Sequence, residues 1–192
     1  NTQQFGQAAA LLKAIRELKN EDSDFEMYVI LGTWIQCQGA FTGEADHHKG
    51  DVGNNTAELE AAVQMVNEYP DIVKIIAVGN EAMVQWAVGY FVYPEVILEG
   101  VNYLKGLRDE GKIPSTTWIT SSDNYASWGG GPENYHTKEL EELIAAVDFV
   151  SLHTYPFHDS HYNPEFWGVL EDEEEMPTEL RIEMAMERAG EY

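Results

Sequence analysis

The sequence has few basic residues and a single cysteine, and each shortage excludes a class of protein. Its 192 residues include 11 Lys and Arg against 34 Asp and Glu, a formal net charge of −23. A surface this acidic repels a phosphate backbone and an anionic membrane surface, so we expect no nucleic-acid partner. The single cysteine, Cys37, excludes an internal disulfide. No apolar run reaches the roughly 18 residues of a membrane span, so we expect no membrane-spanning segment.

The residues that are present suit a globular chain in which helices and strands alternate. With 44% hydrophobic residues, the chain can bury a core, which excludes a disordered protein. Apolar spacing predicts helices over 5–19, 54–69, 94–110, 137–146 and 178–190, and strands over 25–36, 73–81, 116–123 and 147–157. Largely apolar strands that alternate with helices indicate a parallel sheet covered on both faces.

Polar and aromatic residues gather where each predicted strand ends. They are Trp34, Asn80, Glu81, Asp123, Asn124, Trp128, His153 and Tyr155. No Gly-rich phosphate turn opens directly off a strand, as a dinucleotide-binding sheet would need. In a (β/α)₈ TIM barrel, by contrast, the carboxyl ends of all strands meet at one mouth. We therefore predict a TIM barrel rather than a doubly wound sheet, with this chain holding roughly strands 3 to 6 and their helices.

Asn80 and Glu81 form the most informative of these clusters. An arbitrary Asn-Glu pair at a strand end is usually just solvated. Here it follows the apolar run "IIAVG" (75–79), which places a carboxyl group at the rim of a buried strand. Desolvation raises the pKa of a carboxyl group, so such an acid can stay protonated near neutral pH and donate a proton to a glycosidic oxygen.

The segment "IIAVGNEAM" (75–83) resembles the fourth-strand motif of glycoside hydrolase family 17, the β-1,3-glucanases. "VDFVSLHTYPF" (147–157) is similar to the sixth strand of that family, and "YVILGTWIQ" (28–36) to the third. The resemblance implies that Glu81 is the general acid/base, that Asn80 binds the sugar, and that Tyr155 orients the substrate. His153 stands where Asn is commoner, which leaves its role open and looks more like bacterial members.

A retaining glycosidase also needs a nucleophilic carboxylate about 5 Å from the acid/base. In this family it is a Glu in a phrase such as E-[ST]-G-W-P, and neither Glu165 nor Glu191 has that context. We therefore expect residues 1–192 to be part of a single glycosidase catalytic domain. The first two and last two barrel strands would be absent, and the nucleophile would lie beyond Tyr192.

The remaining candidates have a plain structural alternative. Trp34 and Trp128 are suited to stacking on a sugar but also to core packing, whereas we expect Trp86 to pack within its own segment. Asp123 and Asn124 could hydrogen-bond sugar hydroxyls or serve as turn residues. The His-rich segments 43–51 and 157–162 are better explained as loops than as metal sites, so we expect no metal and no cofactor.

The function that these residues predict is retaining hydrolysis of β-1,3-glucan of the laminarin type. Two alternatives stay open: β-1,3-glucan transglycosylation at the same site, or an inactive carbohydrate-binding fragment if the chain truly ends at Tyr192. We expect a monomer that acts on a β-glucan oligo- or polysaccharide outside the cytoplasm, whether extracellular, periplasmic or at the cell surface. The sequence itself carries no signal peptide.

Overall fold

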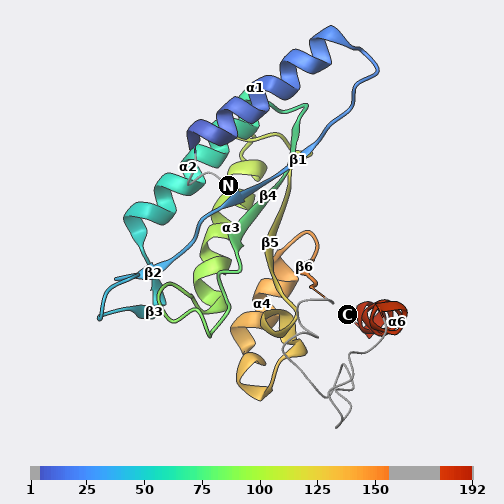
Figure 1. The fold of residues 1–192 in the computed structure, drawn as a ribbon. Helices are drawn as coiled ribbons and strands as arrows, with labels where there is room; N and C mark the ends of the chain where they lie inside the picture. Colours follow the sequence, from blue (N-terminus) through green and yellow to red (C-terminus); the bar gives the residue numbers. More distant parts are fainter. Residues whose placement is uncertain (1–4, 156–177, 192) are drawn as a thin grey trace. The chain divides into compact units, whose positions relative to one another are not determined.

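The computed structural model describes residues 5–155 and 178–191, which fall into two compact units that divide between Leu152 and His153. Figure 1 shows the elements of the chain. Before the boundary lie the helices α1 (Phe5–Glu21), α2 (Val52–Glu68), α3 (Pro94–Asp109) and α4 (Lys138–Ala146), and the strands β1 (Val29–Thr33), β2 (Cys37–Gln38), β3 (Asp46–Gly50), β4 (Val73–Asn80) and β5 (Trp118–Asn124). The strand β6 (Ser151–His153) ends at the boundary, and α6 (Thr178–Glu191) belongs to the second unit.

A four-stranded parallel sheet in the order β1-β4-β5-β6 organises the fold. β4 pairs in parallel with β1 through Leu31 and Ile76, and with β5 through Ala77 and Thr120. Apart from the hairpin strands β2 and β3, strands that lie side by side in the sheet also follow one another along the chain. This is expected when each parallel pair is joined by a helical crossover. The carboxyl ends of the strands therefore lie along one edge of the sheet.

The expected TIM barrel of strands 3 to 6 is wrong. The described residues form a small α/β fold around an open sheet, with β1 and β6 at its two edges. The alternation of helix and strand cannot decide the point, because an open parallel sheet and a barrel share it. Polar strand ends do not decide it either, since ligands also bind at the carboxyl edge of open parallel sheets.

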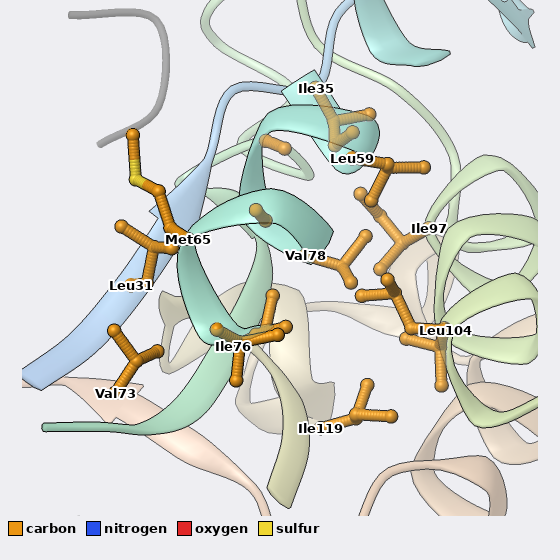
Figure 2. Packing of buried hydrophobic residues seen from close by; sticks show 14 of the residues in the cluster. Leu31, Ile35, Leu59, Met65, Val73, Ile76, Val78, Ile97, Leu104 and Ile119 are labelled. Atoms are coloured by element: carbon orange, nitrogen blue, oxygen red, sulfur yellow. The ribbon is translucent and has the colours of Figure 1, made fainter. Parts of the chain in front are cut away.

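The core lies between one face of the sheet and the helices. Figure 2 shows Leu59 and Met65 of α2 and Ile97 and Leu104 of α3 in one buried cluster with strand residues such as Leu31, Ile76 and Val78. Gly100 of α3 permits this approach, because a Cβ there would lie 2.8 Å from Cγ1 of Val78. Burying each such aliphatic side chain stabilises the fold by about 1.5–3 kcal/mol.

The opposite face of the sheet is only partly covered in the first unit. Side chains alternate along a strand, so Leu31 and Ile119 are buried while their neighbours Ile30 and Trp118 are 57% and 56% exposed. Further along the same face, the paired residues Ala77 and Thr120 are buried. The expectation of a sheet covered on both faces is thus met at Ala77 and Thr120 and not at Ile30 and Trp118.

A short antiparallel hairpin, β2 with β3, projects beyond the carboxyl end of β1. The rings of His47 and His48 stack on those of Phe91 and Tyr93, with centroids 3.7 Å and 4.1 Å apart. The backbone N–H of Tyr93 also donates to the carbonyl of His47 at 3.0 Å. The segment 43–51, predicted to be a solvated loop, is thus partly a strand anchored to the chain just before α3.

Candidate functional site

The carboxyl end of β4 is built to present Glu81. Gly79 has a φ of +85°, and a Cβ there would lie 2.9 Å from Cβ of Ala82 and 3.0 Å from Cδ1 of Ile97, so only glycine fits. Glu81 itself has a φ of +49°, a left-handed conformation that is uncommon for a residue with a side chain. Its backbone N–H donates to the carbonyl of Ser122 at 2.9 Å, and the residue is partly exposed. Backbone strain of this kind clusters at functional sites.

The end of β5 holds the turn that carries Glu81. Oδ2 of Asp123 accepts the backbone N–H of Met83 at 2.7 Å, while Oδ1 accepts that of Asn124 at 2.8 Å. Together with the bond from Glu81 to Ser122, this fixes the chain on both sides of Ala82. Asp123 has no exposed surface, so its carboxylate serves the protein backbone in this structure and is out of contact with solvent.

The electrostatics of this edge reflect two neighbouring carboxylates. Burial raises the pKa of Asp123 to about 6, with the charge of Glu81 adding to the rise and hydrogen bonds from Met83 and Asn124 opposing it. Burial also raises the pKa of the Tyr90 phenol, and the charges of Glu81 and Asp123 raise it further. Tyr90 thus lies close enough to both carboxylates to sense their charge.

The other predicted residues of the first unit lie at the same edge of the sheet but in different environments. Asn80 is exposed at the last position of β4, in register with Ser122. Trp34 follows β1; its indole N–H donates to Oε1 of Gln36 at 2.9 Å, and its backbone N–H to Oε2 of Glu58 at 2.8 Å. Trp34 is half-buried, with part of its ring available to a ligand.

Hydrogen bonds within the protein hold Asn124, the last residue of β5, and Trp128, which follows the strand. Oδ1 of Asn124 accepts the backbone N–H of Ser127 at 2.9 Å, which is the geometry of a turn. The indole N–H of Trp128 donates to the carbonyl of Ser151 at 3.0 Å, and the side chain packs against the core. For these two residues the structural alternative is the better supported.

His153 and Tyr155 belong to the second unit. Their ring centroids lie 6.1 Å apart, edge to face, and Tyr155 is about half exposed. Glu191 lies at the end of α6. Glu165 and the segment 157–162 fall outside the described residues.

Three aromatic residues in the segments that follow the strand ends were missed or misjudged from the sequence. Trp86 was expected to pack but is 71% exposed. Tyr90 lies beside Trp34 with ring centroids 5.0 Å apart, and Phe41 lies 5.9 Å from Tyr90. Both follow strand ends at some distance along the chain. The signal for them in the sequence is the aromatic content of the segments 34–41 and 86–93.

Other features of the described residues do not compete with this edge as a catalytic centre. A hollow of about 540 Å³ lies between α2 and α3 beneath the hairpin, and Glu81 is not among the residues that line it. Residues 5–155 and 178–191 contain no cluster of three metal-ligating side chains. Within those same ranges, no helix combines the length and the apolar character needed to cross a bilayer.

Comparison with known proteins finds similarity to a solved structure. No family model matches the sequence, and no curated protein matches it either. Among solved structures, the chain is similar to an endo-laminarinase from Formosa Hel1_33_131, with 55% sequence identity and a TM-score of 0.84. The match covers 96% of this chain and 47% of that one, so this chain spans about half the length of the solved laminarinase.

Proposed function

We propose that this chain carries the general acid/base of a retaining β-1,3-glucan hydrolase of glycoside hydrolase family 17, and that Glu81 is that residue. The observation that carries the proposal is Glu81 itself, held in a left-handed conformation at the carboxyl end of a parallel strand beside Asn80. The 55% identity with an endo-laminarinase supports β-1,3-glucan as the substrate class.

In the first step, the protonated carboxyl of Glu81 gives its proton to the glycosidic oxygen as the bond from C1 to that oxygen breaks. A second carboxylate attacks C1 from the other side and forms a glycosyl-enzyme. In the second step, Glu81 takes a proton from water, the water oxygen bonds to C1, and the second carboxylate leaves. The configuration at C1 is retained because it is inverted twice.

The second carboxylate of this mechanism stays a prediction of the family resemblance, and we propose that it lies outside residues 1–192. Asp123 is the described carboxylate whose charge is coupled to Glu81 at this edge. It is unsuited to attack a sugar, because it is fully buried and accepts two backbone N–H groups.

The substrate is held, in this proposal, by side chains around Glu81. Asn80 is exposed next to the acid and has an amide suited to a sugar hydroxyl, and Trp34 offers part of a ring for stacking. Tyr155 retains the substrate-orienting role that the resemblance implies. An extracellular, periplasmic or cell-surface location fits a substrate that is a polysaccharide too large to enter a cell intact.

The test is Glu81→Gln in the full-length protein, with the release of reducing ends from laminarin as the measurement. Because Gln keeps the shape but cannot exchange a proton, we expect a loss of about 10²- to 10⁴-fold. An aryl β-glucoside with an acidic phenol needs little protonation to leave, so the first step on that substrate should suffer far less.

The matched control is Glu60→Gln, an exposed carboxylate on α2, which should act like the wild type. Circular dichroism should show the same fold for all three proteins. Laminarin hydrolysis by Glu81→Gln at close to the wild-type rate would refute the assignment of Glu81.

A further inference from the structure

Three aromatic rings form a continuous row among the segments that follow β1, β2 and β4. Tyr90 stands in the middle, with its centroid 5.0 Å from that of Trp34 and 5.9 Å from that of Phe41. The rings are tilted at 44° and 38° to one another. The row combines residues from three connecting segments: Trp34 lies between β1 and β2, Phe41 between β2 and β3, and Tyr90 between β4 and α3.

Phe41, at one end of the row, has a strained backbone conformation. Phe41 has a φ of +61°, which is a genuine outlier for a bulky residue, and its side chain is 68% exposed. Its backbone N–H donates to the carbonyl of Gly89 at 2.6 Å, which ties the segment of Phe41 to that of Tyr90. An apolar ring held in solvent by a strained backbone is unfavourable for folding alone, by about 1–3 kcal/mol for the strain.

The inner part of the row lies at the same edge of the sheet as Glu81, because Trp34 follows β1 and Tyr90 follows β4, and these two strands are neighbours in the sheet. The charge of Glu81 also contributes to the raised pKa of Tyr90, after the larger effect of burial. Phe41, at one end of the row, is exposed to solvent. This arrangement is that of an extended binding surface rather than an isolated exposed side chain.

The chemistry of the row selects a neutral, flat ligand. Pyranose rings have apolar C–H faces that pack on aromatic rings, and their hydroxyls stay hydrated at the edges. An anionic ligand would be opposed by the net charge of −23 and by Glu81 and Asp123 nearby.

We propose that Trp34, Tyr90 and Phe41 form a distal subsite for the glucan chain, with Phe41 as its outermost stacking platform. The inference rests on the proposed function and deepens it. It makes Phe41, the exposed end of the row, a specificity-determining residue that favours long substrates.

The experiment measures kcat/KM of the full-length protein on a series of β-1,3-linked gluco-oligosaccharides of increasing length. For Phe41→Ala we expect kcat/KM on the longest members to fall by about 5- to 50-fold, the loss of one stacked ring, and kcat/KM on the shortest cleaved member to stay unchanged. Phe41→Tyr retains the ring and should restore the preference for long chains. Tyr103→Ala removes a comparably exposed ring from α3, at the separate hollow, and should match the wild type at every length.

Two results would overturn the inference while leaving the proposed function intact. One is a Phe41→Ala profile identical to that of the wild type at every chain length. The other is an equal loss on all lengths, which would indicate a purely structural role. A wild-type protein that cleaves no β-1,3-glucan would instead reject the proposed function and the subsite with it.

Discussion

Asp123 is a carboxylate without exposed surface, and its ionisation is therefore coupled to folding. Burial raises its pKa to about 6, whereas an unfolded Asp has a pKa of about 3.9. Between these values the native protein holds the proton that the unfolded chain releases. The stability that this group contributes is complete below about pH 4 and is lost as the pH rises through about 6.

We predict that Asp123→Asn flattens this dependence, because Asn stays neutral and its Oδ1 can still accept the N–H of Met83. Between about pH 4 and pH 7, the free energy of unfolding of the variant should gain on the order of 2 kcal/mol relative to the wild type. Urea unfolding across this range measures the difference, with the exposed Asp24→Asn as the control. Parallel curves for Asp123→Asn and the wild type would contradict the coupling.

For single residues, the sequence predicted their place at a strand end better than the contacts that their side chains make. The strand end before Glu81 was recognisable from polarity alone, since an apolar run stops at Asn80. The role of Asp123 was not, because Asp123 looked like a tip residue suited to a sugar. Its burial depends on Met83, which is 40 residues away in the chain, and no local pattern reveals such a partner.

The helix α2 shows how one element is fixed by its cap. The helix starts at Val52, and Oδ1 of Asp51 accepts the backbone N–H of Asn54 at 3.1 Å. Oδ2 of Asp51 also accepts from the side-chain amide of Gln36 at 3.0 Å, which links the cap to the loop after β1. The hydrogen bonds from Asn54 have the largest effect in lowering the pKa of Asp51, and the bond from Gln36 lowers it further.

We predict that Asp51→Ala destabilises the protein by about 1–2 kcal/mol, the usual loss of an N-cap. The contribution of Asp51 is present above the pKa of an unfolded Asp and is lost as the pH falls through the lowered native value. Thr56→Ala is the control, because Thr56 is an exposed residue inside the same helix. Chemical denaturation should show little change for Thr56→Ala; an equal loss in both variants would argue against the cap at Asp51.

The elements themselves were largely predictable because their signals are local. Apolar spacing placed α2, α3 and α4. The side chain of Thr137 caps α4 by accepting the backbone N–H of Leu140. The hairpin of β2 and β3 was missed because its second strand, DHHKG, is polar. Its ring stacking with Phe91 and Tyr93 joins residues more than 40 positions apart. The order of elements also could not predict whether the sheet is open or closed, since helices and strands alternate in both open parallel sheets and barrels.

At the scale of the whole molecule, charge is the dominant asymmetry. The excess of 34 acidic over 11 basic residues gives self-repulsion that favours expansion of the chain. Exposed ion pairs such as Lys138 with Glu142 act in the opposite sense, but each is weak because both partners are solvated. The balance between these effects decides how salt acts on stability.

We predict that salt stabilises this protein. Raising the ionic strength from about 0.01 M to 1 M shortens the Debye length from about 30 Å to 3 Å, which screens the long-range repulsion more than the short-range pairs. We expect the melting temperature to rise by roughly 3 °C, a gain on the order of 1 kcal/mol. Differential scanning calorimetry in NaCl and in KCl should give equal gains at equal ionic strength, because screening does not depend on the identity of the cation. A melting temperature that falls with added salt would mean that the ion pairs outweigh the net charge, and would refute this account of the molecule.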